Sequence, residues 1–139
     1  MPQQILREKI LDVIEGSQQP KTGALATVNE RGRPCVRIMT FKHESLILYS
    51  VTSLKSKKVA HMRNNPFVSI EMSRNITRLD SDYIVAEAKA EIITDDKVKK
   101  HFWDETLSVY FSGPEDPDYC ILKFTPETID YMGLETLKC

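Results

Sequence analysis

Basic and hydroxyl side chains gather between positions 37 and 58 in a pattern suited to holding a single phosphate group. These side chains are Arg37, Lys42, Thr52, Ser56, Lys57 and Lys58. The last three stand where a helix is expected to begin. A helix start has unpaired backbone N–H groups and the positive end of the helix dipole, so an anion is favoured there. The segment therefore predicts a cradle for a phosphate dianion.

The members of this cradle differ in what they offer an anion. Arg37 has a planar fork that matches two phosphate oxygens, whereas the lysines act as point charges and the hydroxyls donate single hydrogen bonds. Arg37 and Lys42 are separated by an odd number of residues, which sends them to opposite faces of an ideal strand. We therefore expect Arg37 to contribute more than Lys42.

A simpler interpretation is that the basic helix is only a solvated surface, which is the usual position of such a charge run. Arg37 favours the cradle instead, because it stands within an apolar strand, where a buried charge needs a partner. A bound phosphate would be that partner.

Composition narrows the possible classes of protein. The 139 residues suit one domain over 1–139. The 19 basic and 20 acidic residues nearly cancel, which disfavours nucleic acid and anionic membrane as partners. No segment approaches the ~18 apolar residues of a membrane helix, and the start lacks a basic, apolar leader. We expect a cytoplasmic protein.

Cysteine and histidine spacing argues against a metal site. The three cysteines show no C-x-x-C pattern, and the three histidines have no partner at i, i+4. We therefore expect reduced thiols and no protein-bound metal.

Apolar periodicity predicts one leading helix followed by short strands. Helical spacing joins Leu6, Ile10, Val13 and Ile14. Strands are expected over 22–28, 34–41, 45–51, 68–72, 84–92, 119–124 and 129–132, with helices over 55–63 and about 94–103. The short link 42–44 predicts a hairpin, so that the first three strands form a meander.

This order of elements predicts a mainly β fold, a barrel with α-helices at its ends. We expect six or seven antiparallel strands plus three to four helices. The small residues that alternate along 84–92 suggest a crowded barrel interior.

The motifs resemble those of the flavin-binding split barrels related to pyridoxamine 5′-phosphate oxidase, and most closely those of short bacterial general stress proteins. The family pattern is an Arg-led strand ending in Lys, then Tyr-Thr, then Ser-Arg-Lys opening a helix that ends in Asn-Pro. The matching segments here are 37–42, 51–52, 56–58 and 65–66. The resemblance continues through 85–91, 111–119 and 129–131, and so covers nearly the whole chain.

The resemblance implies a homodimer that holds two FMN molecules between its protomers. The implied cofactor residues are Arg37, Ile38, Met39, Thr40, Lys42, Val51, Thr52, Ser56, Lys57, Lys58 and Tyr131. The phosphate would lie on the basic and hydroxyl members, and the strand backbone of 38–40 would flank the ring. FAD and a deazaflavin stay open, because each carries a phosphate for the same cradle.

For function, the resemblance implies a flavin-dependent oxidoreductase of stress physiology. The Arg-Leu-x-Pro segment with which the oxidase grips its substrate does not occur before Cys139, so we do not expect vitamin B6 oxidation. Two alternatives stay open. One is a non-catalytic protein that binds or sequesters flavin, and the other is a small barrel whose basic helix binds nucleic acid.

Overall fold

The computed structural model describes residues 1–16, 21–75 and 77–139. In chain order the elements are α1 (Gln3–Glu15), β1 (Thr22–Val28), β2 (Pro34–Thr40), β3 (Lys42–Glu44), β4 (Ile47–Ser53), α2 (Lys57–Asn64), β5 (Phe67–Ser73), β6 (Tyr83–Ile93), α3 (Asp96–His101), the 3-10 helix η1 (Glu105–Val109), β7 (Tyr119–Tyr131) and β8 (Glu135–Lys138).

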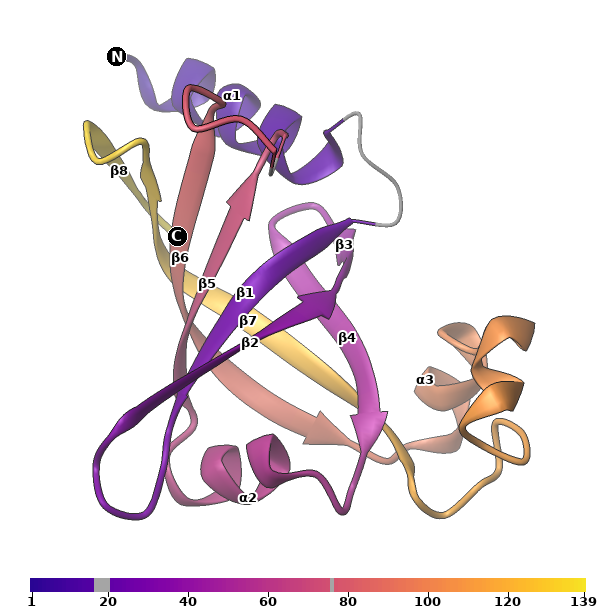
Figure 1. Ribbon diagram of the computed structural model, residues 1–139. Helices are drawn as coiled ribbons and strands as arrows, with labels where there is room; N and C mark the ends of the chain where they lie inside the picture. Colours follow the sequence, from indigo (N-terminus) through magenta and orange to yellow (C-terminus); the bar gives the residue numbers. More distant parts are fainter. Residues whose placement is uncertain (17–20, 76) are drawn as a thin grey trace.

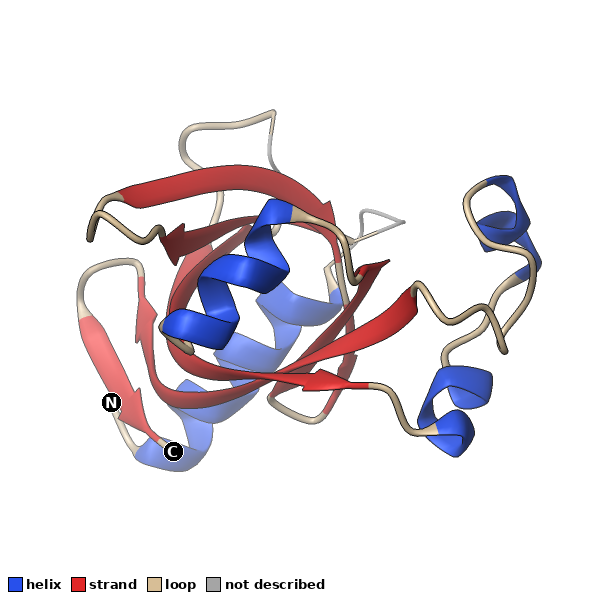
Figure 2. Ribbon diagram, turned by 90° about the horizontal axis from the view of Figure 1, so that it is seen from below, coloured by secondary structure: helices blue, strands red, loops and turns tan. Residues whose placement is uncertain are grey.

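The strands form one antiparallel sheet that curls into a barrel (Figures 1 and 2). Seven strands follow the hydrogen-bonded order β2-β1-β5-β6-β7-β4-β3, and β8 pairs with β7 outside that path. The strands β2 and β3 end this order on opposite sides, although only Phe41 separates them in the chain. The sheet must therefore curl until its two ends meet at Phe41, and the predicted β-barrel with helices is confirmed.

Phe41 fixes this meeting point in the core. Its ring is 5% exposed and packs edge-on against Phe124, with 5.9 Å between the ring centroids. Its backbone N–H donates to the carbonyl of Lys21 at 2.8 Å. A buried aromatic ring with a satisfied backbone thus holds the turn from one sheet edge to the other.

Helix α1 covers one end of the barrel, and α2 covers the opposite end (Figures 1 and 2). The predicted apolar stripe of α1 is confirmed, since Leu6, Ile10 and Val13 are 0% exposed. Small side chains of β6, which include Ala86 and Ala88, are also buried, as the alternation along 84–92 predicted. None of the described helices is both long and apolar enough to cross a membrane.

The predicted hairpin between 34–41 and 45–51 is wrong. Within the described residues β2 pairs only with β1, whereas β4 pairs with β7 and with β3. The link 42–44 is itself strand β3, and Ser45 makes the turn into β4 with a φ of 56°. The predicted meander fails for the same reason, because the chain changes sheet edge at Phe41.

Two predicted boundaries also change. The strands expected at 119–124 and 129–132 are one strand, β7, which continues through Pro126 opposite a register shift between Glu87 and Ala88. Helix α2 begins at Lys57 rather than at position 55, because the backbone N–H of Lys55 donates to the Ser53 hydroxyl in a turn.

The segment after β6 begins as its sequence predicts. The Asp95 carboxylate accepts hydrogen bonds from the backbone N–H groups of Lys97 and Val98, which caps α3. The helix ends at His101, earlier than the predicted 103, and η1 follows. Together α3 and η1 stand beside the barrel wall in Figure 1.

Candidate functional site

The barrel wall has a seam between β2 and β4. Among the described strands, β2 has a partner on its β1 side only, and β4 loses β3 as a neighbour after Tyr49. In Figure 1 the two strands come together at the end of β2 and diverge towards α2. The Ser50 hydroxyl bridges the narrow end by donating to the Thr40 carbonyl at 2.8 Å. Two strand edges therefore border one opening.

This seam contains an open groove of about 400 Å³. Its lining residues come from β1, β2, β4 and α2. They are Thr22, Arg37, Ile38, Met39, Thr40, Ser50, Val51, Thr52 and Lys58. Most of the site residues predicted from the sequence thus lie around one opening, although they belong to three different elements.

Arg37 is held by one end of its guanidinium group. Its Nη1 donates to Thr27 Oγ1 at 2.7 Å and to the carbonyls of Leu25 and Cys35 at 3.2 and 3.3 Å. Across the described ranges, Nε and Nη2 have no hydrogen-bond partner, so one edge of the fork stays available. Burial holds the pKa of Arg37 below its ordinary value.

Lys58 lies close enough to Arg37 for the two positive charges to interact. Its Nζ donates to Thr52 Oγ1 at 3.0 Å. Burial first and the Arg37 charge second lower the pKa of Lys58. Neither cation forms an ion pair with any described residue. Two half-buried positive charges without a carboxylate make this groove favourable for an anion.

The start of α2 adds further donors. Thr52 Oγ1 lies 3.4 Å from Ser56 Oγ, which places the N-cap residue of α2 beside the groove. The Ser56 side chain makes no hydrogen bond to the first turn of the helix, so that turn lacks a side-chain cap. Lys57 is exposed and does not line the groove.

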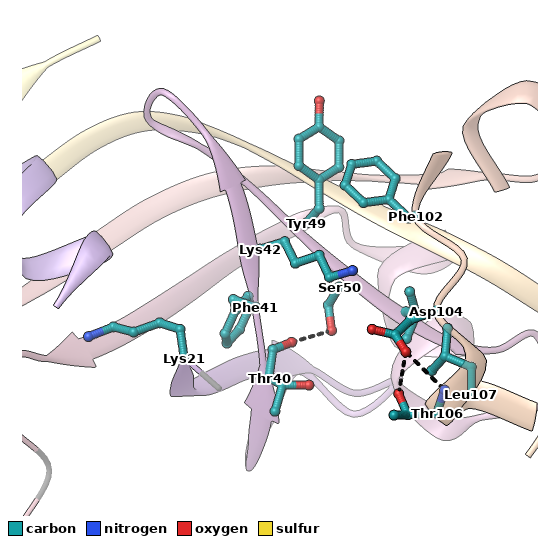
Figure 3. Close-up of a pocket in the computed structure, with 11 residues that line it drawn as sticks. Lys21, Thr40, Phe41, Lys42, Tyr49, Ser50, Phe102, Asp104, Thr106 and Leu107 are labelled. Atoms are coloured by element: carbon teal, nitrogen blue, oxygen red, sulfur yellow. Dashed lines mark hydrogen bonds between the residues drawn. The ribbon is translucent and has the colours of Figure 1, made fainter. Parts of the chain in front are cut away.

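A second recess adjoins the groove and shares Thr40, Ser50 and Val51 with it (Figure 3). It measures about 230 Å³ and lies between β4 and the segment from α3 to η1. Its other lining residues are Lys21, Phe41, Lys42, Tyr49, Phe102, Asp104, Thr106 and Leu107. Apolar walls thus surround a few polar groups at this position.

The charged groups of the recess are two lysines, Lys21 and Lys42, and one carboxylate, Asp104. Lys42 lines the recess and not the groove, so the structure separates it from Arg37. Asp104 accepts hydrogen bonds from the backbone N–H and the hydroxyl of Thr106, which lower the pKa of its carboxyl group. Beside them, the ring of Tyr49 packs against Phe102 with 4.5 Å between the centroids.

Tyr131 is a further predicted site residue that does not line the groove. It ends β7, and its hydroxyl donates to Asp82 Oδ2 at 2.8 Å. Lys9 of α1 lies over its ring at 5.9 Å from the centroid. Tyr131 therefore belongs to the α1 end of the barrel and lines neither recess of its own chain.

Sequence reasoning missed Thr22 and Ser50 as groove residues, and Thr27 as the buried hydroxyl that holds Arg37. A signal for Ser50 exists, because Ser50 and Thr52 alternate on a strand face that is otherwise apolar, and both are buried. The part of the recess formed by α3 and η1 has no such local signal. Only the tertiary fold brings Phe102 and Asp104 beside β4.

Comparison with known proteins agrees with this architecture. Residues 6–133 match the family model described as pyridoxamine 5′-phosphate oxidase. The chain is 36% identical to general stress protein 26 of Bacillus subtilis (strain 168) over 133 residues, which cover 96% of this chain and 92% of that protein.

Solved structures extend the comparison to the fold. The general stress protein 26 of Bacillus anthracis str. Sterne is 38% identical, with a TM-score of 0.82 over 96% of this chain and 98% of that one. A pyridoxamine 5′-phosphate oxidase-related, FMN binding protein of Nostoc punctiforme PCC 73102 shares the fold at 17% identity, with a TM-score of 0.71 over 94% and 84% of the two chains. The family match spans nearly the whole chain, and the chain belongs to the pyridoxamine 5′-phosphate oxidase family.

Proposed function

We propose that the groove binds the phosphate end of a flavin, with FMN as the cofactor, and that the protein is a flavin-dependent oxidoreductase. The observation that carries this proposal is the pair Arg37 and Lys58. They are two half-buried cations in electrostatic contact, and their hydrogen-bond acceptors are neutral. A phosphate dianion supplies the missing negative charge.

The donor set suits a phosphate monoester. The free edge of the Arg37 fork can bind two oxygens, and Lys58, Thr52 and Ser56 can serve the remaining ones. The uncapped first turn of α2 adds backbone N–H groups. Lys57 is exposed, so its contribution is a longer-range attraction that salt would screen.

The groove also has edges suited to a flat ring. Ile38, Met39 and Thr40 of β2 line one side and Val51 of β4 lines the other. An isoalloxazine ring placed there would supply the electron transfer, and the protein would supply position and electrostatics. The adjoining recess, with Lys42 and Asp104, is the place for an electron donor or acceptor.

FMN is the first choice among flavins for a comparative reason. The Nostoc punctiforme protein of the same fold is named as FMN binding, and we carry that ligand to this chain as part of the proposal. FAD or a deazaflavin would present a phosphate to the same side chains. The role in stress physiology and the cytoplasmic location are also proposals, the former suggested by the name of the Bacillus subtilis relative.

We further propose that the protein is a homodimer. The outer face of β2 is apolar, with Val36 70% and Ile38 63% exposed, and Phe67 of β5 is 53% exposed. On the neighbouring strand β1, Ala26 is paired with Val36 and Ala24 with Ile38, so small residues extend the same face. An exposed apolar sheet face of this kind is typical of a surface that a second copy covers.

The dimer has a direct test. Ile38→Lys should convert the protein to a monomer in light scattering, whereas Leu134→Lys, at a residue 77% exposed elsewhere, should not. A monomeric unmodified protein would contradict the proposal. Since Tyr131 lies outside the groove of its own chain, any ring contact that it makes would be to the flavin of the second protomer.

The flavin proposal is tested by the absorbance spectrum of the purified protein. Bands at ~375 and ~450 nm would identify an oxidised flavin, and mass analysis of the released molecule would distinguish FMN from FAD and a deazaflavin. A colourless protein that also fails to bind added FMN would overturn the proposal. Multiple turnovers with a reduced nicotinamide and a small organic acceptor would separate an oxidoreductase from a protein that only binds flavin.

A further inference from the structure

The inner end of the Arg37 side chain enters a hydrogen-bonded chain that leads away from the groove. Nη1 of Arg37 lies 2.7 Å from Thr27 Oγ1, the shortest of its three contacts. On the other side of Thr27, the same oxygen lies 2.8 Å from Nδ1 of His61 in α2. Thr27 is only 1% exposed. One buried hydroxyl thus joins an arginine of β2 to a histidine of α2.

The direction of these hydrogen bonds follows from what each group can do. A guanidinium group only donates, so Thr27 Oγ1 must accept from Arg37. The hydroxyl then has one hydrogen left to donate. Within the described part of the chain, Nδ1 of His61 is the acceptor that the structure places beside it. The sequence of donors is therefore Arg37 to Thr27 to His61.

This direction sets the state of the imidazole. Nδ1 can accept only if it carries no hydrogen, which corresponds to the imidazole tautomer with its hydrogen on Nε2. With hydrogen on Nδ1, Thr27 Oγ1 would accept from both Arg37 and His61, and the contacts of the described residues would leave its own buried hydrogen without an acceptor. An unsatisfied buried donor is costly, so the Nε2–H tautomer completes the chain.

We propose that Thr27 and His61 are positioning residues for the phosphate site. By accepting from Nη1, Thr27 holds the guanidinium plane so that its free edge faces the groove, and His61 orients the Thr27 hydroxyl for that task. Neither residue touches the phosphate. This inference rests on the proposed phosphate site, and it adds residues that none of the sequence motifs contains.

Helix α2 gives this arrangement a second consequence. Lys58 and His61 are three residues apart on α2 and therefore share a face of the helix. Lys58 reaches Thr52 of β4, while His61 reaches Thr27 of β1. One helix face thus sets the position of both cations, directly for Lys58 and through two hydrogen bonds for Arg37.

The test compares FMN with riboflavin, which has the same ring but no phosphate. The ratio of the two dissociation constants measures what the phosphate contributes, and a general loss of ring binding leaves that ratio unchanged. Thr27→Val should weaken FMN binding about tenfold while riboflavin affinity stays the same. His61→Leu should act in the same direction by about threefold to fivefold.

Conservative variants provide the rescue. Thr27→Ser keeps the hydroxyl, and His61→Asn keeps an acceptor oxygen near the position of Nδ1, so both should retain the ratio of the unmodified protein. The double variant Thr27→Val with His61→Leu should match Thr27→Val alone, because His61 acts through Thr27. His43→Leu serves as the control. His43 belongs to β3 rather than to α2, and its Nδ1 contacts the Ser45 carbonyl.

The outcomes separate this inference from the proposal beneath it. If the unmodified protein does not prefer FMN over riboflavin, the phosphate site fails, and the inference fails with it. If FMN is preferred but Thr27→Val and His61→Leu leave the ratio unchanged, the phosphate site stands and the positioning role is wrong. Equal weakening of both ligands, or additive effects in the double variant, would also overturn the positioning role.

Discussion

The two ends of the barrel differ in the polar groups that accompany their buried apolar side chains. Under α1 the interior is aliphatic, with Leu6 and Ile10 fully buried. At the α2 end the buried groups include the hydroxyls of Thr27 and Thr52, and the half-buried Arg37 lies beside them. Apolar burial stabilises a fold without needing a ligand, whereas partly desolvated cations without carboxylates do not. One end therefore supplies stability, and the other is suited to binding.

The largest expected effect tests the α1 end. Ile10→Ala should lower the free energy of unfolding by about 2–5 kcal/mol, because it leaves a cavity in a fully packed region. The FMN affinity of the folded protein should not change. Urea unfolding measures the first quantity, and flavin fluorescence titration measures the second. Ile5→Ala on the same helix, where the side chain is 44% exposed, is the control and should cost far less.

The next effect tests the α2 end in the opposite sense. Arg37→Ala should weaken FMN binding about a hundredfold, since two charge-assisted hydrogen bonds are lost. The ligand-free protein should lose less stability than Ile10→Ala, because the variant also removes a desolvated charge. Fluorescence titration and urea unfolding again measure the two quantities. Arg33→Ala, at an exposed arginine just before β2, should leave both unchanged, and undiminished FMN affinity in Arg37→Ala would place the phosphate elsewhere.

A smaller effect distinguishes Lys58 of α2 from Lys55, which lies in the turn before that helix. Lys58→Ala should weaken FMN binding about tenfold, because Lys58 lines the groove. Lys55→Ala should change it by less than about twofold, because an exposed charge is screened by solvent and salt. Titrations at low and high salt measure both. Equal effects of the two substitutions would favour a diffuse basic surface over a defined cradle.

The smallest effect is a dependence of FMN affinity on alkaline pH. Burial and the Arg37 charge lower the pKa of Lys58 in the ligand-free protein. A bound dianion favours the ammonium form and raises that pKa, so between the two values binding takes up a proton. While the phosphate is a dianion, affinity should be constant below the lower pKa and then fall between the two pKa values, in total by no more than the loss of about tenfold expected for Lys58→Ala.

Lys58→Arg is the matched control for this pH dependence. Its guanidinium group stays charged across the same range, so the affinity of this variant should not fall with Lys58 titration. When both proteins are titrated over the same pH values, the ligand ionises in the same way in both, so a difference between the curves comes from residue 58. Parallel curves for the two proteins would show that Lys58 is not the group that titrates.

Local periodicity was sufficient to predict much of the fold. The stripe that includes Leu6 and Ile10 predicted α1, and the alternation from Ile84 to Ile92 predicted β6 with its buried small face. The helix expected from about position 94 is observed as α3, which starts at Asp96 after the Asp95 cap. Each of these signals lies within one element, so neighbouring residues are enough to reveal it.

The errors arose where distant strands decide the structure. Two separate strands were expected, over 119–124 and 129–132, yet the register shift at Glu87 and Ala88 accommodates Pro126 within one strand, β7. The exchange of sheet edge at Phe41 likewise depends on the closure of the whole barrel. Such features follow from pairing across the sheet, which no local pattern contains.

For the candidate site too, some residues could be predicted from local sequence and others could not. Arg37 was expected because it is a charge on an apolar strand, and Thr52 and Lys58 because they stand before and at the next helix start; the structure brings all three to one groove. Thr27 and His61 escaped prediction because a threonine in a strand and a histidine on a helix are common in structural roles. Their proximity depends on how α2 packs against β1.

The way the seam is held has a consequence for the kinetics of folding. Its β2 wall belongs to a local hairpin with β1, but its β4 wall is held by β7, where Ser53 pairs with Tyr119 near the other end of the chain. Pairing over such a sequence separation is slow to form, and the groove does not exist before it. A bound flavin would therefore slow unfolding and leave the refolding rate almost unchanged, so that the cofactor prolongs the lifetime of the native state without guiding its formation.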